Sequence, residues 1–190
     1  MKTLELHLIT VGISLLSNFA RDTGCTLEET VRRGSQLEEY LKSDPQRASA
    51  ELAGFLGLLG SKARLPNVSV ALIHSQTAEG KLAATHLRKW LAAHGVKVTT
   101  IQLSNVDLPA NAKGDIEACQ RAAETGLREL RDKLVSHIQK VRAQVPAIKV
   151  LVNATGGYKA QIAVAYSVGK LLDARTYYQH ETYRTPVFLP

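Results

Sequence analysis

The stretch from 150 to 161 restricts the possible fold more than any other part of the chain. Its apolar, β-branched residues stop at Asn153, two glycines (Gly156-Gly157) follow Thr155, and Lys159 begins an alanine-rich helical pattern. This order predicts a buried strand, a tight glycine turn and a helix. Glycines let the backbone approach a ligand closely, and the first N–H groups of a helix lack partners within it. Because such N–H groups favour anions, we expect the turn to bind a phosphate, with Lys159 adding positive charge.

The same stretch also fits an ordinary strand–helix turn, in which the glycines serve packing and the lysine is solvated. It is not a Walker A loop, because GxxxxGK[ST] is absent, and it is not a GxGxxG dinucleotide fingerprint. The choice between a phosphate site and a packing turn therefore depends on the rest of the chain.

Strand and helix patterns alternate along the chain. We predict strands at 4–11, 68–73, 96–101, 148–152, 174–178 and 186–189, and helices at 13–19, 27–41, 45–59, 78–94, 115–144 and 158–172. This alternation is typical of an α/β, Rossmann-like fold with a mostly parallel sheet flanked by helices. The helices at about 26–60 delay the return to the sheet. We therefore expect one domain over 1–190 with a helical insertion after the first strand–helix unit, which would serve as a lid or dimer element.

The topology predicts where a ligand would bind. In parallel sheets, ligands lie beyond the carboxyl ends of the strands, where the strand order reverses. If the strands at 4–11 and 148–152 are central neighbours, Ser14 and the Gly156-Gly157 turn come together at that point. Ser14 is then either a helix-capping hydroxyl or a ligand contact.

Charge and cysteine content limit the partners. The net charge of +7 and the pI of about 9.5 favour an anionic partner. Basic patches interleaved with aromatics are missing, so a compact polyanion fits better than long nucleic acid, and we predict neither DNA nor a membrane as a partner. Two isolated cysteines and the lack of a signal sequence favour a cytoplasmic location. No cluster has metal-ligand spacing, so we expect neither a metal nor a cofactor.

Two motifs resemble CRISPR-associated Rossmann-fold (CARF) domains. The residues VGISLLSN at 11–18 look like the G-x-S-L-L-x-N signature of that family, and NATGGYK at 153–159 looks like its N-x-T-G-G-x-K signature. The segments at 177–181 and 188–190 are similar to the point where such a domain closes. One departure is Ile13, where many relatives carry threonine, so a hydroxyl role at this position is lost.

The resemblance implies a homodimer that binds a cyclic oligoadenylate across its two-fold axis in type III CRISPR signalling. Cyclic tetra-adenylate is the more common ligand and cyclic hexa-adenylate the alternative. We expect a ring nuclease, in which a ribose 2′-OH attacks its adjacent phosphate without metal and linear di-adenylate is released. Lys159 and Ser14 are the predicted catalytic residues. The predicted ligand-binding residues are Gly12, Ile13, Ser14, Asn18, His74, Gln76, Asn105, Asn153, Thr155, Gly156, Gly157 and Lys159.

Other functions remain open. The same residues fit a non-catalytic sensor domain that regulates a C-terminal or separate effector, such as a HEPN ribonuclease. The HEPN pattern R-x4-6-H occurs at 88–94, 131–137 and 175–180 of this chain, but each match lies in a segment that the Rossmann-like fold already needs. An enzyme with a mononucleotide cofactor ranks last, because a dinucleotide fingerprint is absent.

Overall fold

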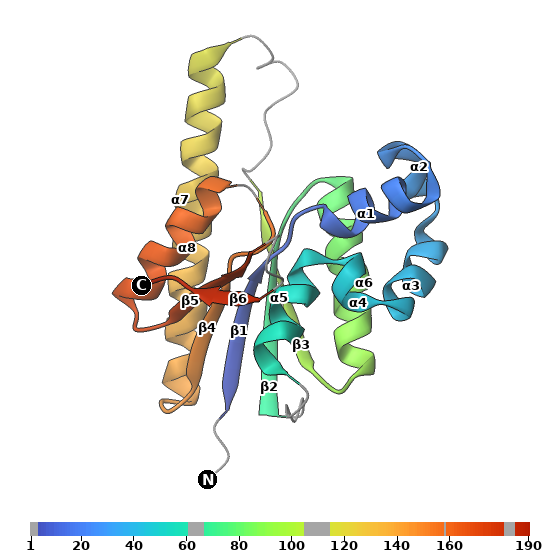
Figure 1. The fold of residues 1–190 in the computed structure, drawn as a ribbon. Coiled ribbons are helices and arrows are strands. Elements are labelled where there is room, and N and C mark those ends of the chain that lie inside the picture. The colour runs from blue at the N-terminus through green and yellow to red at the C-terminus, as the bar shows by residue number, and fades with distance from the viewer. Residues whose placement is uncertain (1–3, 61–66, 105–114, 158, 181–184) are drawn as a thin grey trace.

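Six strands form one sheet in the computed structural model, which describes residues 4–60, 67–104, 115–157, 159–180 and 185–190 (Figure 1). The sheet order is β3-β2-β1-β4-β5-β6. The strands are β1 (Glu5–Thr10), β2 (Val68–Ser75), β3 (Lys97–Leu103), β4 (Lys149–Asn153), β5 (Arg175–Gln179) and β6 (Pro186–Phe188). All neighbouring strands are parallel except β5 and β6, which are antiparallel. The predicted α/β fold with a mostly parallel sheet is confirmed.

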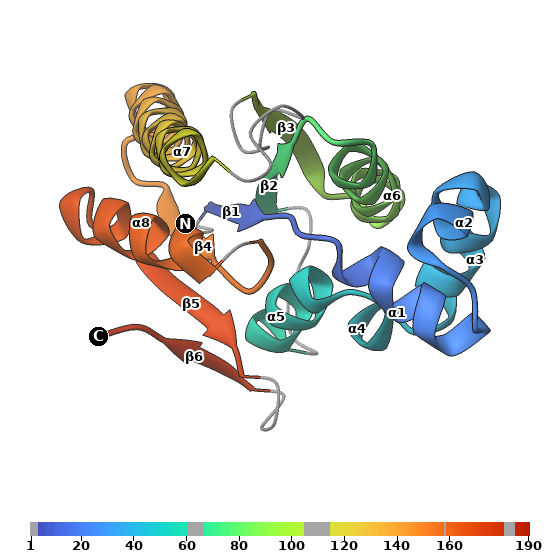
Figure 2. The ribbon, with the colours of Figure 1, turned by 90° about the horizontal axis from the view of Figure 1, so that it is seen from above.

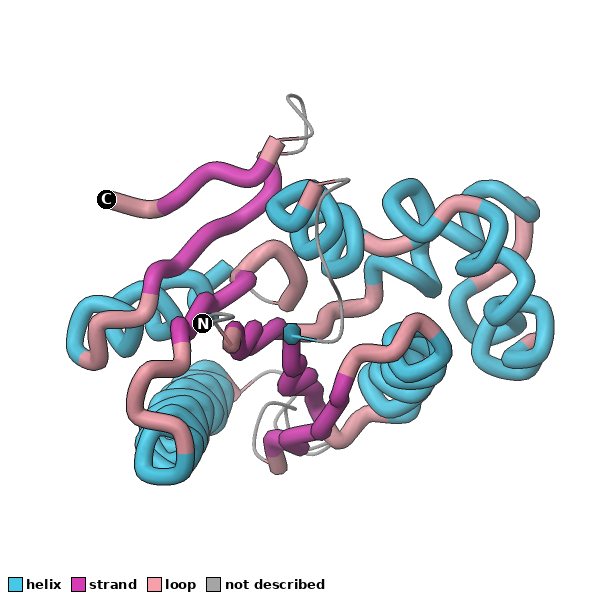
Figure 3. The backbone as a smooth tube through the Cα atoms, turned by 90° about the horizontal axis from the view of Figure 1, so that it is seen from below, coloured by secondary structure: helices cyan, strands magenta, loops and turns pink. Residues whose placement is uncertain are grey.

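Helices cover both faces of the sheet (Figure 2). They are α1 (Ser14–Thr23), α2 (Leu27–Arg32), α3 (Gly34–Ser43), α4 (Pro45–Ala48), α5 (Ala50–Leu59), α6 (Ala78–Ala93), α7 (Ile116–Gln144) and α8 (Lys159–Leu171). Helices α7 and α8 share one apolar core with the sheet, and the helices from α1 to α6 share the other. Figure 3, seen from below, shows α2 to α5 on the side of the sheet away from α7 and α8. Among the described residues, no helix is both long enough and apolar enough to cross a membrane.

Two predicted helices are each divided in two. The helix predicted at 27–41 is interrupted at Arg33, whose backbone angles (φ −95°, ψ 33°) are not helical. The helix predicted at 45–59 is interrupted at Ser49, whose backbone is extended and whose hydroxyl accepts a hydrogen bond from the N–H of Leu52. At Ser49 this local hydrogen bond overrides the apolar periodicity, because a serine satisfies a new helix start better than a helix interior. Arg33 makes no side-chain capping bond, and only its backbone angles mark the break. Helices α2 and α4 begin with side-chain caps, from the hydroxyl of Thr26 and the carboxylate of Asp44.

Side chains of α7 bind backbone groups at the carboxyl end of the edge strand β3. The ammonium group of Lys133 donates to the carbonyl oxygen of Gln102. The carboxylate of Glu129 accepts from the N–H of Ser104 at 2.8 and 3.0 Å and pairs with Lys133 at 2.7 Å. Backbone groups at the carboxyl end of the open edge are thus already bound within the chain.

Polar side chains cross the core between the sheet and α5. His7 and Tyr177 are both fully buried, and the Nδ1 atom of His7 lies 3.1 Å from the Tyr177 hydroxyl. The Nε2 atom of His7 lies 3.4 Å from a carboxylate oxygen of Glu5, which also pairs with Lys149 at 2.8 Å. The hydrogen bond from His7, with help from Lys149, lowers the pKa of Glu5 to about 2. Burial lowers the pKa of His7, so this histidine is neutral in the folded protein at neutral pH.

We expect the protein to lose stability as the pH falls below about 6.5, the ordinary histidine value. The pKa of His7 is lower in the folded chain than in the unfolded chain, so the unfolded chain binds more protons in this range. The contribution is fully present above the unfolded pKa and is lost as the pH falls toward the folded pKa, at up to about 1.4 kcal/mol per pH unit. Burial lowers the pKa of His86 and His137 as well, in the same direction.

Urea unfolding at a series of pH values between about 5 and 8 measures this loss. The substitution His7→Phe keeps an aromatic ring beside Phe55, whose ring centre lies 5.0 Å from that of His7. It is expected to make the free energy of unfolding less dependent on pH. An unchanged pH dependence in this variant contradicts the role given to His7.

Candidate anion-binding site

The sheet order reverses between β1 and β4. Strands β2 and β3 follow β1 toward one edge, and β5 and β6 follow β4 toward the other. β1 and β4 are neighbours, with Glu5 paired to Lys149 and Ile9 paired to Asn153. The prediction that these two strands lie side by side at the centre is confirmed. In parallel sheets, this is the place where ligands bind.

The turns after β1 and β4 contact each other. A Cβ atom placed on Gly12 would lie 2.7 Å from the backbone nitrogen of Gly157, and one placed on Gly156 would lie 2.6 Å from the carbonyl oxygen of Thr10. The hydroxyl of Thr10 donates to the carbonyl oxygen of Gly156 at 2.5 Å. The glycines are therefore needed for close backbone approach at this point, whatever the ligand.

A buried carboxylate lies between the two turns. Glu51, in the first turn of α5, has 1% of its surface exposed. Its Oε1 atom accepts from the N–H of Gly12 at 2.8 Å, and its Oε2 atom accepts from the hydroxyls of Ser14 at 2.5 Å and Ser49 at 2.7 Å. The space that a side chain on Gly156 would need is filled by the same carboxylate. Glu51 thus connects the helical insertion to the centre of the site.

Ser14 is partly exposed and its hydroxyl has two protein partners. It donates to Glu51 and accepts from the N–H of Ala50 at 3.0 Å, so it caps α5 and not its own helix. Ile13 occupies the N-cap position of α1, makes no side-chain capping bond, and has 44% of its surface exposed. The first turn of α1 carries no acidic residue. The start of this helix is therefore favourable to an anion.

Asn153 lies under the glycine turn and holds it in place. It is fully buried, and its amide nitrogen donates to the carbonyl oxygen of Glu51 at 3.0 Å. Its Oδ1 atom accepts from the N–H of Thr155 at 3.1 Å and from the Thr155 hydroxyl at 2.5 Å. That hydroxyl in turn accepts from the N–H of Gln179 at 3.0 Å. These contacts give Asn153 and Thr155 a structural role beneath any ligand.

Gly157 and Lys159 form the exposed part of the glycine turn. Gly157 has a positive φ of 94°, which side-chain-bearing residues rarely adopt. Lys159 is exposed and begins α8, whose first turn carries no acidic residue. The predicted residues Gly12, Gly156 and Gly157 thus belong to the two turns that follow β1 and β4, and Ser14 and Lys159 begin the helices after them.

Among the remaining predicted residues, Asn18 and His74 form hydrogen bonds with groups outside the two turns. The amide nitrogen of Asn18 donates to the carbonyl oxygens of Arg47 and Ala48 at 3.2 and 3.1 Å, so it ties α1 to the end of α4. His74 lies within β2, 8% exposed, and its Nδ1 atom is 2.8 Å from the carbonyl oxygen of Ser75. Gln76 is exposed after β2, and Asn105 lies outside the described residues.

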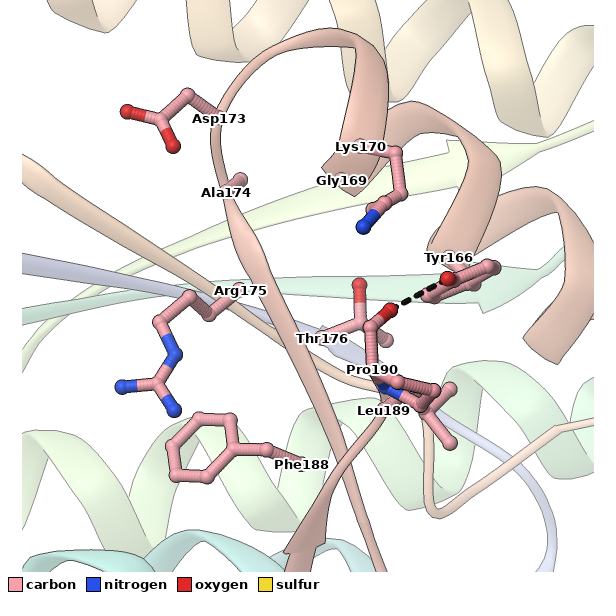
Figure 4. A pocket seen from close by; sticks show the side chains of 10 residues that line it. All are labelled: Tyr166, Gly169, Lys170, Asp173, Ala174, Arg175, Thr176, Phe188, Leu189 and Pro190. Carbon is pink, nitrogen blue, oxygen red and sulfur yellow. Dashed lines mark hydrogen bonds between the residues drawn. The ribbon is translucent and has the colours of Figure 1, made fainter.

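A separate pocket of about 470 Å³ opens at the amino end of β5 (Figure 4). Its walls come from the second half of α8, the start of β5, and the end of β6 with the two residues that follow it. The guanidinium of Arg175 lies 3.8 Å from the ring centre of Phe188, and the ammonium of Lys170 lies 5.9 Å from that of Tyr166. Because β4 and β5 are parallel, this pocket at the amino end of β5 lies at the opposite end of the strands from the two turns, which follow the carboxyl ends of β1 and β4. It is not part of the candidate site.

The site offers hydrogen-bond donors and positive charge. Within the described ranges, no three His, Cys, Asp or Glu side chains lie close enough together to hold a metal ion. Ser14 is partly exposed, but it donates its hydrogen to Glu51. To a phosphate group, the two turns offer the backbone at two helix starts and the cation of Lys159. Such a set suits the binding of phosphate groups.

A comparison with protein families identifies the family to which the chain belongs. Residues 46–190 match the model of a family described as CRISPR-associated protein (Cas_APE2256). The matched part includes Glu51 and the glycine turn, and it begins after Gly12 and Ser14. No curated protein sequence matches the chain. Since the match covers well over half of the residues, the chain belongs to the CRISPR-associated protein family Cas_APE2256.

Proposed function

We propose that the protein binds a cyclic oligoadenylate across a homodimer in type III CRISPR antiviral signalling, with cyclic tetra-adenylate as the first candidate. Membership of a CRISPR-associated family supports a role in this defence. The two motifs that resemble CARF domains support the class of ligand. The observation that carries the proposal is the contact between the turns after β1 and β4, because it brings both motifs to the point where the sheet order reverses.

The ligand phosphates would lie over the exposed parts of the two turns. Gly157 leaves the backbone open there, and Lys159 supplies a cation. Neither α1 nor α8 carries an acidic residue in its first turn. The excess of basic over acidic residues, +7 for the chain, adds a general attraction for a ring of phosphates.

We further propose that the protein opens the ring. A ribose 2′-oxygen attacks the adjacent phosphorus and loses its proton, the bond from phosphorus to the 5′-oxygen breaks, and the 5′-oxygen takes up a proton. The products are a 2′,3′-cyclic phosphate and a 5′-hydroxyl, and two such cuts in cyclic tetra-adenylate give linear di-adenylate. Lys159 would stabilise the charge on the phosphate oxygens, and Ser14 would contact the attacking ribose.

Incubation with radiolabelled cyclic tetra-adenylate in EDTA, followed by native and denaturing gels, tests both proposals. We expect a shifted band on the native gel and conversion to linear di-adenylate on the denaturing gel. A shift with intact ligand indicates a non-catalytic sensor that regulates an effector. Absence of a shift with both cyclic tetra-adenylate and cyclic hexa-adenylate contradicts the binding proposal.

A further inference from the structure

The direction of the hydrogen bonds at Ser14 is determined by its neighbours. An ionised carboxylate can only accept hydrogen bonds, so the Ser14 hydroxyl must donate its hydrogen to Glu51, from which it lies 2.5 Å away. One lone pair of the same oxygen accepts from the N–H of Ala50 at 3.0 Å. The oxygen keeps a second lone pair, and Ser14 is partly exposed. Toward a ligand, Ser14 is therefore an acceptor and not a donor.

The carboxylate that sets this direction is itself firmly held. Glu51 is 1% exposed and accepts hydrogen bonds from the N–H of Gly12 and the hydroxyls of Ser14 and Ser49. Its place in the first turn of α5 is one where a helix favours negative charge. Because Gly12 donates through a backbone N–H, the group facing it must be an acceptor in any variant.

We propose that Glu51 is a positioning residue that keeps Ser14 a hydrogen-bond acceptor for a ribose 2′-hydroxyl, so that the site prefers ribonucleotide over deoxyribonucleotide rings. This inference rests on the proposed function. A phosphate oxygen is an acceptor and gains nothing from an acceptor-only serine, whereas a 2′-hydroxyl can donate to it. The 2′-hydroxyl is also the group by which a protein distinguishes RNA from DNA. The Ser14–Glu51 pair therefore recognises the ribose 2′-hydroxyl, and Lys159 binds phosphate.

The substitution Glu51→Gln reverses the direction of the hydrogen bond between Ser14 and residue 51, and it keeps the shape of the side chain. The N–H of Gly12 requires an oxygen opposite it, so the carboxamide nitrogen must face the hydroxyls of Ser14 and Ser49. Ser14 then accepts from Gln and turns its hydrogen toward the ligand. The variant also removes a buried negative charge near the phosphates. We expect it to bind a deoxyribose ring as tightly as the unmodified protein does, or more tightly, and to lose the preference for ribose.

Calorimetric titration with cyclic tetra-adenylate and with its tetra-2′-deoxy analogue tests the inference, at a temperature and over a time in which the denaturing gel shows the ribose ring intact. We expect the unmodified protein to bind the ribose ring about tenfold more tightly than the deoxy ring, which is about 0.7 kcal/mol for the one hydrogen bond in each of two subunits. In Glu51→Gln and in Ser14→Ala this ratio is expected to fall toward one. The matched control is Ser17→Ala, because the exposed Ser17 hydroxyl binds the carbonyl oxygen of Ile13 within its own helix. It is expected to keep the tenfold ratio.

The outcomes separate this inference from the proposed function. If the unmodified protein binds both rings equally, or if Glu51→Gln keeps the ratio, the inference is wrong while the binding of cyclic tetra-adenylate stands. If Glu51→Gln weakens both rings to the same extent, Glu51 is only structural. If the unmodified protein binds neither ring, the proposed function fails and the inference fails with it. Thermal melts of each variant identify any that do not fold. If Glu51→Gln does not fold, Ser14→Ala still tests the contact with the 2′-hydroxyl, and an unchanged ratio in that variant contradicts the inference.

Discussion

Replacing Lys159 with alanine is expected to weaken the binding of cyclic tetra-adenylate by at least about 100-fold, with an unchanged melting temperature. A hydrogen bond to a charged group contributes roughly 1.5–3 kcal/mol, and a ring bound across a two-fold axis would lose one such contact in each subunit. Lys159 is exposed at the start of α8, so its removal leaves no cavity in the core. The loss of affinity should be larger at low salt, because screening weakens a phosphate–lysine contact.

Titration calorimetry at low and at physiological salt measures this loss. The matched control is Lys170→Ala, which removes the same charge from the other end of the same helix, beside the separate pocket. We expect this control to change the affinity less than about threefold, through net charge alone. Equal losses in the two variants indicate attraction by overall charge, and an unchanged affinity in Lys159→Ala removes Lys159 from the site.

Replacing Gly156 with alanine is expected to lower the free energy of unfolding by about 3 kcal/mol, the scale of severe overpacking in a core. A Cβ atom at this position would lie 2.6 Å from the carbonyl oxygen of Thr10 and 2.8 Å from the carboxyl carbon of Glu51. Both neighbours are held, Thr10 by β1 and Glu51 by its three hydrogen bonds. The φ angle of Gly156 is not positive, so the expected cost is steric and not conformational.

Urea unfolding of Gly156→Ala beside Gly34→Ala measures this cost. At Gly34, in the first turn of α3, the nearest atoms to an added Cβ are side-chain atoms at 3.7 and 3.9 Å, an ordinary contact distance. Alanine also has a better helix propensity than glycine, so Gly34→Ala should be neutral or stabilise the protein by up to about 1 kcal/mol. If Gly156→Ala is equally well tolerated, the two turns are not as tightly packed as their geometry indicates.

Much of the fold could be predicted because its buried strands are apolar runs. Strands β1, β2 and β4 lie in the middle of the sheet, and β-branched or leucine-rich segments are typical of strands covered on both faces. The breaks at Arg33 and Ser49 could not be predicted from periodicity, since the apolar spacing continues across both. At Ser49 the decisive interaction is a single capping hydroxyl.

The meeting of the two turns could be predicted from the topology, but the carboxylate of Glu51 that lies between them could not. The glycine turn and Lys159 are contiguous in sequence, whereas the partners of Glu51 at Ser14 and Gly12 lie 37 and 39 positions away. One signal for Glu51 was present in the sequence, since it is an acidic residue on the apolar stripe of Phe55 and Leu59. A charge on such a stripe requires a buried partner, and only the folded chain shows which one. The strand–helix connection after β3, which holds Asn105, stays outside the described residues.

The α7 side chains at the end of β3 hinder self-assembly through the edge of the sheet. An open parallel edge is a template on which strands of other molecules can add and grow into fibrils. Here Lys133 occupies the carbonyl of Gln102 and Glu129 occupies the N–H of Ser104, so an incoming strand must displace an ion pair before it can add there. Concentrated protein should therefore resist fibril growth from this end of the edge, and a specific pair of copies would have to meet through another surface.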